Sequence, residues 1–396
     1  MSPECLSSFS LLKLPALHFG AGSFSHLPEH VRLSGRCPMV VTGSRSFEAS
    51  GRLSWLLHSL GRVTFAYLHR RVEGEPSPEM IDEAVAAGRS AGCDSVIAVG
   101  GGSVIDAGKA VSAMLLQKHP VERYIEGRDD FLEHDGRKVP FIAVPTTSGT
   151  GSEATNNSVI SRVGSDGFKR SLRHPAFVPD VAVIDPELLC TAPRALTVAS
   201  GMDAFTQLIE AWVSPFASPF TDLLAFSGME YFIRSFLRAC RDGADDHAVR
   251  GDVAYAAFLS GVALCNAGLG IVHGFASSIG GAFDIPHGVL CATLLADATK
   301  ENILQLRLSG SGQRALSKYA AVGRLLSQQP ELSDVCACDM LVETLAHWQQ
   351  DLNVPRLGNY GIGMEHITHL AAVTRSKSNP VELDPDSLRK ILFARL

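Results

Sequence analysis

Two histidines and a pair of polar residues at helical spacing are the side chains best suited to metal chemistry in this sequence. His273 and His287 lie in an almost chargeless stretch, and Asp203 and Gln207 stand upstream, four residues apart. Residues four apart share one face of a helix, and carboxylate and imidazole groups suit Fe²⁺, Zn²⁺ or Mn²⁺. Spacing alone leaves two readings open: a metal site, or histidines satisfied within a packed core.

A second set of residues suits phosphate binding. The run GGGS (100–103) directly follows the strand-like run SVIAV (95–99) and precedes a helical stretch. A glycine turn lets a pyrophosphate approach backbone N–H groups, and the helix dipole adds its positive end. We predict Ser103 as the N-cap of this helix and Asp106 in its first turn. A turn that binds no ligand is the alternative.

A second loop, PTTSGTGSE (145–153), follows another strand-like run and is rich in hydroxyls and glycines. Alone, it suits either phosphate or ribose binding or a turn with capping side chains. Two such loops, each leaving the carboxyl end of a predicted strand, fit the rule that ligands bind at that edge of α/β sheets. The presence of two such loops at one edge of the sheet favours a nucleotide as the ligand.

The elements that must position these residues change character near the middle of the chain. Short β-branched runs predict buried strands at 38–42, 95–99, 141–144 and 181–184, and a helix at 78–92 lies between the first two. Helical periodicity dominates afterwards, at 221–240, 313–326, 339–352 and 386–396. We therefore predict an α/β nucleotide-binding domain over 1–186 and an all-helical domain over 187–396, with a cleft between them.

Composition narrows the class of protein. The net charge of −6 over 396 residues offers no electrostatic footprint for nucleic acid. Nine scattered cysteines without a framework spacing favour reduced thiols in a cytoplasm. The stretch 253–283 has no Asp, Glu, Lys or Arg and is long enough to span a bilayer, but its polar residues and flanks favour a buried helix pair instead.

The sequence resembles the iron-containing (group III) alcohol dehydrogenases. The likeness runs over nearly the whole chain, in motifs that keep one order: GGGSVID (100–106), PTTSGTGSE (145–153), VAVIDPELL (181–189), SGMDAFTQLIEAWVS (200–214), VHG (272–274), IPHG (285–288) and SNP (378–380). The resemblance implies a dehydroquinate synthase-like fold in which residues 187–396 form the metal-binding and catalytic domain and the active site lies in the cleft. It also implies hydride exchange between NAD(P)H and an alcohol/aldehyde pair, and a homodimer or higher homo-oligomer.

The resemblance also implies roles for individual residues. Asp203, His273 and His287 match three of the four metal ligands of the family, and His273 with Ser277 would border the reacting carbonyl. The positions that match the family's cofactor contacts are Gly101, Gly102, Ser103, Thr146, Thr147, Thr150, Asn157 and Lys169.

Four positions depart from the family pattern. Gln207 replaces the fourth ligand, a histidine, and offers a weaker neutral oxygen. Ser277 replaces a second active-site histidine and so removes a titratable group suited to proton relay. Gly43 replaces the aspartate that accepts from the adenosine ribose, which removes repulsion of a 2′-phosphate, and Arg45 could attract one. Glu75 stands where a cofactor-contacting asparagine is common.

We therefore expect an NAD(P)H-dependent aldehyde reductase, with NADP(H) favoured, in which a divalent ion, Fe²⁺ or Zn²⁺, polarises the carbonyl oxygen. Two alternatives stay open. One is a metal-independent reductase of the same fold, resembling maleylacetate reductases, and the other is a non-catalytic nucleotide-binding relic. We expect a small-molecule substrate and no nucleic-acid or membrane partner.

Overall fold

A parallel sheet forms the centre of the amino-terminal half of the molecule. The computed structural model describes residues 8–43, 46–164, 167–310 and 312–396, and within them six strands pair in the order β1-β8-β5-β4-β2-β3, all parallel. The strands are β1 (Ala16–Phe19), β2 (Pro38–Gly43), β3 (Leu68–Val72), β4 (Ser95–Gly100), β5 (Phe141–Pro145) and β8 (Val181–Ile184). Their parallel direction brings the carboxyl ends together at one edge.

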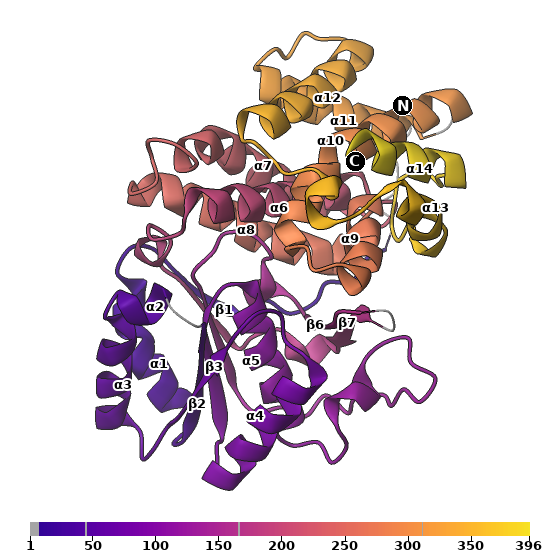
Figure 1. Ribbon diagram of the computed structural model, residues 1–396. Helices are drawn as coiled ribbons and strands as arrows, with labels where there is room; N and C mark the ends of the chain where they lie inside the picture. The colour runs from indigo at the N-terminus through magenta and orange to yellow at the C-terminus, as the bar shows by residue number, and fades with distance from the viewer. Residues whose placement is uncertain (1–7, 44–45, 165–166, 311) are drawn as a thin grey trace.

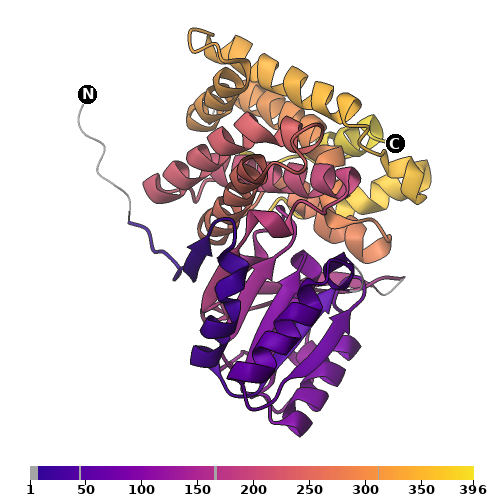
Figure 2. The ribbon, with the colours of Figure 1, turned by 90° about the vertical axis from the view of Figure 1, so that its left-hand side faces the viewer.

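Helices cover both faces of this sheet (Figures 1 and 2). Alternate residues of the central strands pack against α4 and α5 on one face and against α1 and α3 on the other, so the strands are buried on both sides and read as continuous apolar runs. The helices of this half are α1 (Leu27–Ser34), α2 (Ser46–Ala49), α3 (Arg52–Val63), α4 (Pro78–Ala91) and α5 (Gly102–Met114).

An antiparallel hairpin stands apart from the main sheet. Its strands are β6 (Asn157–Arg162) and β7 (Phe168–Arg173), with Asn157 opposite Arg173. Figure 1 shows the hairpin between the sheet and α9 (Ile271–Ala282). A Cβ on Gly280 of α9 would lie 3.0 Å from the Lys169 side chain, so the hairpin and α9 are in close contact.

The second half is helical and stacks on the carboxyl edge of the sheet (Figure 2). An apolar cluster joins the halves, with Ile184 and Leu189 on one side and Phe258 and Val262 on the other. The helices are α6 (Arg194–Val213), α7 (Pro219–Ala239), α8 (His247–Ala267), α9, α10 (His287–Ser309), α11 (Gln313–Ser327), α12 (Asp334–Asp351), α13 (Met364–Val373) and α14 (Pro385–Ala394).

The predicted fold class is confirmed, and most predicted elements appear within a few residues of their expected bounds. The sequence patterns missed β1, β3 and the hairpin, because these strands are short, largely exposed or interrupted by polar residues. Among the described residues, one helix, α8, has the length and hydropathy of a membrane span, and 72% of the window that qualifies is buried inside the protein. The domain boundary between residues 186 and 187 stays a prediction.

The start of α5 corrects two predictions. Gly101 is the N-cap, in an extended conformation, and Ser103 lies inside the helix rather than capping it. Asp106 lies beyond the first turn, which contains no acidic residue. The turn tightens earlier than the sequence pattern suggested because Gly102 can pack directly against Thr150, where a Cβ would lie only 2.5 Å from the threonine Cγ2.

Candidate active site

The glycine turn and the second loop form one structure at the carboxyl edge of the sheet. Thr146 donates its backbone N–H to the carbonyl of Gly100 at 2.9 Å. A Cβ on Gly101 would lie 3.4 Å from Thr147, so this threonine also borders the turn. A Cβ on Gly102 would lie 2.5 Å from Thr150 Cγ2, so the bare backbone of the two glycines forms a cradle at the start of α5, beside the cavity that Gly102 and Ser103 line. A pyrophosphate fits such a cradle.

A buried lysine fixes the second loop beneath this cradle. Lys109 donates to the Ser152 carbonyl at 2.7 Å, to Thr155 Oγ1 at 2.8 Å and to the Asn157 carbonyl at 2.7 Å. Burial lowers the pKa of Lys109 to about 8. Asp106 also ties the loop to α5, since its carboxylate accepts from the Val159 N–H at 3.0 Å and from the Ser152 hydroxyl. Sequence reasoning missed the role of Lys109, whose partners become visible only in the fold.

Gly43 ends β2 beside the glycine turn. A Cβ built on Gly43 would meet Val104 Cγ2, in the first turn of α5, at an ordinary 3.5 Å. A side chain at this position would therefore point towards the edge where the cofactor is predicted to bind. Arg45, the predicted attractant for a 2′-phosphate, lies outside the described residues.

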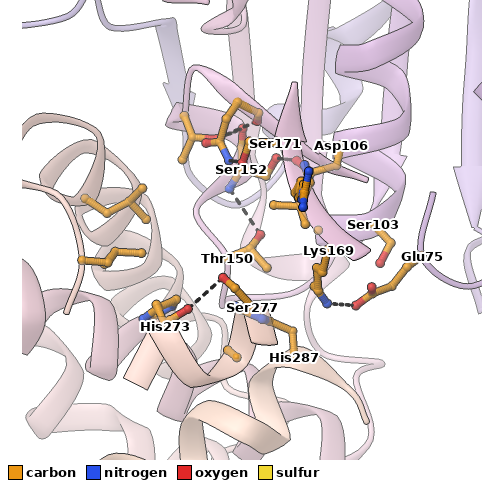
Figure 3. Close-up of a pocket in the computed structure, with 18 of the residues that line it drawn as sticks. Glu75, Ser103, Asp106, Thr150, Ser152, Lys169, Ser171, His273, Ser277 and His287 are labelled. Carbon is orange, nitrogen blue, oxygen red and sulfur yellow. Dashed lines mark hydrogen bonds and ion pairs between the residues drawn. The ribbon is translucent and has the colours of Figure 1, made fainter. Parts of the chain in front are cut away.

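The hairpin contributes the predicted residues Asn157 and Lys169. Lys169 Nζ forms an ion pair with Glu75 Oε1, and Glu75 Oε2 accepts from Ser161 Oγ at 2.9 Å (Figure 3). Asn157 Nδ2 donates to Ser171 Oγ at 3.1 Å. Although burial opposes ionisation, Lys169 holds the pKa of Glu75 below its usual value. The glutamate therefore stays ionised and keeps the lysine in place.

Three predicted metal ligands converge on the helical side of the cleft. Asp203 Oδ1 lies 3.3 Å from His273 Nε2 and 3.6 Å from His287 Nε2. Apart from these two ion-pair contacts, this buried carboxylate oxygen has no hydrogen-bond partner within the described part of the chain, and neither does His287 Nδ1. A fourth donor, the thiol of Cys291, completes a group whose ligand atoms all lie within 4.8 Å of one another. An unpartnered buried carboxylate oxygen costs free energy unless a cation or donor satisfies it, so the group fits a divalent ion.

The helix starts bring these donors together. Pro286 is the N-cap of α10, so the helix begins at His287 and places Cys291 one turn later on the same face. A Cβ on Gly288 would lie 2.5 Å from the Ala199 carbonyl, so only glycine lets α10 approach the backbone of α6 this closely. That approach carries His287 and Cys291 to Asp203, which lies on α6.

Glu210 orients one of the imidazoles and was missed by sequence reasoning. Its carboxylate contacts His273 Nδ1 at 2.7 Å and accepts from the Val272 N–H at 2.7 Å. A carboxylate on one ring nitrogen fixes the tautomer and leaves Nε2 available as a ligand, which is the usual arrangement around metal-bound histidines. Glu210 lies seven residues after Asp203, so helical spacing could have identified it on the same face of α6.

The four donors differ in protonation state. Although burial opposes it, Cys291, Glu210 and Asp203 raise the pKa of His273 well above its usual value, so this imidazole must lose a proton before its Nε2 can bind a cation. Burial alone would raise the pKa of Asp203, but His287 and His273 hold it below its usual value, so the carboxylate is ionised. Burial lowers the pKa of His287 to about 4 and leaves a neutral imidazole. Burial raises the pKa of the Cys291 thiol to about 12. A coordinated divalent cation deprotonates a thiol outright.

Gln207 and Ser277, the two atypical residues, have protein partners. Gln207 Oε1 accepts from Ser260 Oγ at 2.6 Å. Ser277 Oγ donates to the His273 carbonyl at 2.9 Å and accepts from Lys377 Nζ at 3.0 Å. Lys377 also donates to the His273 carbonyl at 2.8 Å. Sequence reasoning missed Lys377, which reaches the cleft from a segment a hundred residues further along the chain.

One cavity of about 190 Å³ joins the two sides of the cleft. Figure 3 shows Ser103, Thr150, Lys169 and Glu75 opposite His273, Ser277 and His287 across it. The predicted residues that line it are Glu75, Gly102, Ser103, Thr150, Asn157, Lys169, Gln207, His273, Ser277 and His287. Asp203 lies behind the imidazoles, and Gly43, Gly101, Thr146 and Thr147 lie at the sheet edge outside the cavity.

Comparison with known proteins identifies this architecture. Residues 15–186 match the family model described as iron-containing alcohol dehydrogenase, and residues 197–396 match its C-terminal counterpart. The chain belongs to the iron-containing alcohol dehydrogenase family. Membership makes it an NAD(P)-dependent enzyme that interconverts an alcohol and an aldehyde, and it implies a divalent metal such as iron.

Relatives match over nearly their full length. The chain is 32% identical to the NADPH-dependent butanol dehydrogenase of Clostridium saccharobutylicum, with 95% of each protein covered. It is 34% identical to long-chain-alcohol dehydrogenase 1 of Geobacillus thermodenitrificans, covering 96% of this chain and 95% of the relative. The solved alcohol dehydrogenase from Oenococcus oeni superposes with a TM-score of 0.87 at 28% identity, over 98% of this chain and 100% of that one.

Proposed function

We propose that this enzyme works as an NAD(P)H-dependent aldehyde reductase in which a divalent cation assists hydride transfer. The observation that carries the proposal is the buried, unpartnered Asp203 Oδ1, which faces two imidazole Nε2 atoms at the wall of the cavity. When bound, the cation would supply Lewis-acid polarisation of the carbonyl oxygen and the nicotinamide would supply the hydride. Asp203, His273 and His287 would hold the cation.

The chain's own residues would position the reactants. The glycine turn would bind the pyrophosphate through backbone N–H groups, and Thr146, Thr147 and Thr150 would border the cofactor. The pair of Lys169 and Glu75 would fix the hairpin above the cofactor. The nicotinamide and the carbonyl would be held facing each other from opposite sides of one small cavity. Hydride transfer would then take place within one complex, as an effectively unimolecular step.

The nascent alkoxide needs a proton, and Lys377 is the group that would supply it. Its ammonium donates to Ser277 Oγ, which lines the cavity, so a proton can pass from Lys377 Nζ through the Ser277 hydroxyl. This pair would replace the histidine that the family usually places at position 277. The hydrogen bond from Lys377 to Ser277 is already formed in the protein. To donate to the alkoxide, the Ser277 hydroxyl would have to turn from the His273 carbonyl towards the cavity.

Lys377→Met tests this route. We expect kcat for aldehyde reduction to fall by about 100-fold, as for loss of a general acid, with the Kd for cofactor unchanged. Ser277→Ala should lower kcat less, because a water can bridge the gap. Lys390→Met, which removes an exposed lysine of α14, is the matched control. An unchanged kcat in both Lys377→Met and Ser277→Ala would exclude the route.

Metal analysis separates the proposal from its alternatives. Protein purified without chelators should contain one divalent ion per chain, and removal of the ion should abolish NAD(P)H oxidation across a panel of aldehydes. Full activity in metal-free protein would favour the metal-independent reductase. Tight cofactor binding without any turnover would favour the non-catalytic relic. A preference for NADP(H), a cytoplasmic location and a homo-oligomeric state stay predictions from the sequence.

A further inference from the structure

The thiol of Cys291 completes the donor group that Asp203 and the two histidines begin. Cys291 Sγ lies 3.8 Å from His273 Nε2 and 3.8 Å from His287 Nε2. The residue is fully buried on α10, with its sulfur among the ligand atoms gathered around Asp203. Nothing in the sequence patterns singled out this cysteine, which shares a helix face with His287.

The spacing of the four atoms matches a tetrahedral ion. With Zn–N and Zn–O distances of about 2.1 Å and a Zn–S distance of about 2.3 Å, tetrahedral angles put nitrogen and oxygen about 3.4 Å apart and sulfur and nitrogen about 3.6 Å apart. The corresponding distances here are 3.3 and 3.6 Å from Asp203 Oδ1 to the two nitrogens, and 3.8 Å from each nitrogen to the sulfur. The other two distances, between the two nitrogens and from the sulfur to Asp203 Oδ1, lie within 4.8 Å. Four of the six distances therefore already match a tetrahedral site.

Gln207, the residue at the expected fourth ligand position, is committed elsewhere. Its amide oxygen, the only ligand atom that an uncharged glutamine offers, accepts the Ser260 hydroxyl at 2.6 Å. Ser260 is itself fully buried on α8. This hydrogen bond occupies one of the two lone pairs of the oxygen and holds the amide against α8.

We propose that Cys291 supplies the fourth metal ligand in place of Gln207, so that this enzyme holds its ion with one carboxylate, two imidazoles and one thiolate. The assignment rests on the metal-assisted function proposed above. On binding, the Sγ–H bond breaks, the proton leaves to solvent and the sulfur lone pair forms the bond to the ion. Asp203 and Cys291 then neutralise both charges of a divalent cation.

A thiolate changes which metal the site selects. Sulfur ligands favour Zn²⁺ over harder ions, and mixed sulfur and nitrogen sites are typical of zinc. We therefore expect purified protein to prefer Zn²⁺ to Fe²⁺ and to bind Mg²⁺ weakly. His273 and His287 line the cavity, whereas Asp203 and Cys291 do not. Because four protein ligands fill a tetrahedral ion, a substrate oxygen would have to enter from the cavity as a fifth ligand.

Cobalt substitution tests the ligand set without using activity. The full-length protein is freed of metal, and Co²⁺ is added. A Co²⁺–thiolate bond gives a charge-transfer band in the near ultraviolet, which oxygen and nitrogen ligands do not give. We expect this band in the unmodified protein and in Gln207→Ala, and its loss in Cys291→Ser. Cys240→Ser, which changes another buried thiol of the helical half, should keep the band.

Zinc affinity provides the second measurement. Loss of a residue that only supports a metal ligand can raise the Kd for the metal by roughly 100-fold, and loss of a direct ligand should cost at least as much. We therefore expect the Kd for Zn²⁺ to rise by roughly 100-fold or more in Cys291→Ser and to stay unchanged in Gln207→Ala. Absence of the charge-transfer band in unmodified protein that binds Co²⁺ would overturn the thiolate assignment and leave the metal-assisted function standing. So would an unchanged Zn²⁺ affinity in Cys291→Ser. Failure of the unmodified protein to bind either ion would overturn both.

Discussion

Replacing Gly43 by aspartate should move the cofactor preference from NADPH towards NADH. Gly43 is the last residue of β2, and a Cβ at this position would lie 3.5 Å from Val104 Cγ2, which is ordinary contact. Its φ is not in the left-handed region, so a side chain causes no backbone strain there. The substitution should therefore leave the fold intact and place a carboxylate beside the glycine turn.

The size of the change follows from two electrostatic effects. A hydrogen bond from a ribose hydroxyl to a charged acceptor is worth about 1.5–3 kcal/mol, or roughly 10- to 150-fold in affinity. Repulsion between the carboxylate and a 2′-phosphate acts in the same direction, at about 4 kcal/mol for two unit charges 4 Å apart near a protein surface and less when salt screens them. We expect the ratio of kcat/KM for NADPH to that for NADH to fall by about 100-fold or more.

Steady-state kinetics with both cofactors at one aldehyde concentration measures this ratio. Gly43→Ala is the matched control, because its methyl group fits the same space without charge and should leave the ratio unchanged. Gly43→Asn, which can accept a hydrogen bond but does not repel phosphate, should give an intermediate shift. The reasoning is refuted if the unmodified enzyme already prefers NADH, or if the alanine and aspartate variants give the same ratio.

Three further perturbations follow from the geometry. Gly102→Ala would put a Cβ 2.5 Å from Thr150 Cγ2. The Kd for NADPH, measured by fluorescence titration, should therefore rise about tenfold or more, which corresponds to about 1.4 kcal/mol of lost contact. Gly61→Ala is the control, because its Cβ would meet Tyr67 at an ordinary 4.0 Å and should leave this Kd unchanged. Asp203→Asn removes a ligand charge and should release the metal, so retention of one ion per chain would contradict its role. Burial raises the pKa of Glu153 from 4.5 to about 7, so the native state keeps a proton that the unfolded chain loses, and stability falls as the pH rises between these values. Glu153→Gln should therefore stabilise the protein by about 3 kcal/mol at pH 8 and little at pH 4.5, as measured by urea unfolding.

Much of the fold follows from local pattern. The strands at 38–43 and 95–100 are buried on both faces and so appear in the sequence as unbroken β-branched runs. The glycine run after the second of these could only be a tight strand–helix turn. The exposed edge strand at 68–72, LHRRV, has no such run, because one of its faces meets solvent and its side chains are charged. In the hairpin, β7 (FKRSLR) was missed for the same reason, whereas β6 (NSVISR) is mostly buried and was missed because polar residues interrupt its apolar run.

The residues of the site also divide into those that local sequence pattern predicts and those that it does not. Sequence alone determined that Asp203, His273 and His287 are the donors to consider, because their types and their motifs carry the information locally. The tertiary structure alone decided which residues complete the group. Glu210 shares a helix face with Asp203, and Cys291 shares one with His287. Packing between helices, such as the contact of Gly288 with the backbone of α6, brings these faces together, and Lys377 joins them from a distant segment. Local pattern specifies which face of a helix a residue occupies, whereas the partner of that face is set by contacts between segments far apart in the chain.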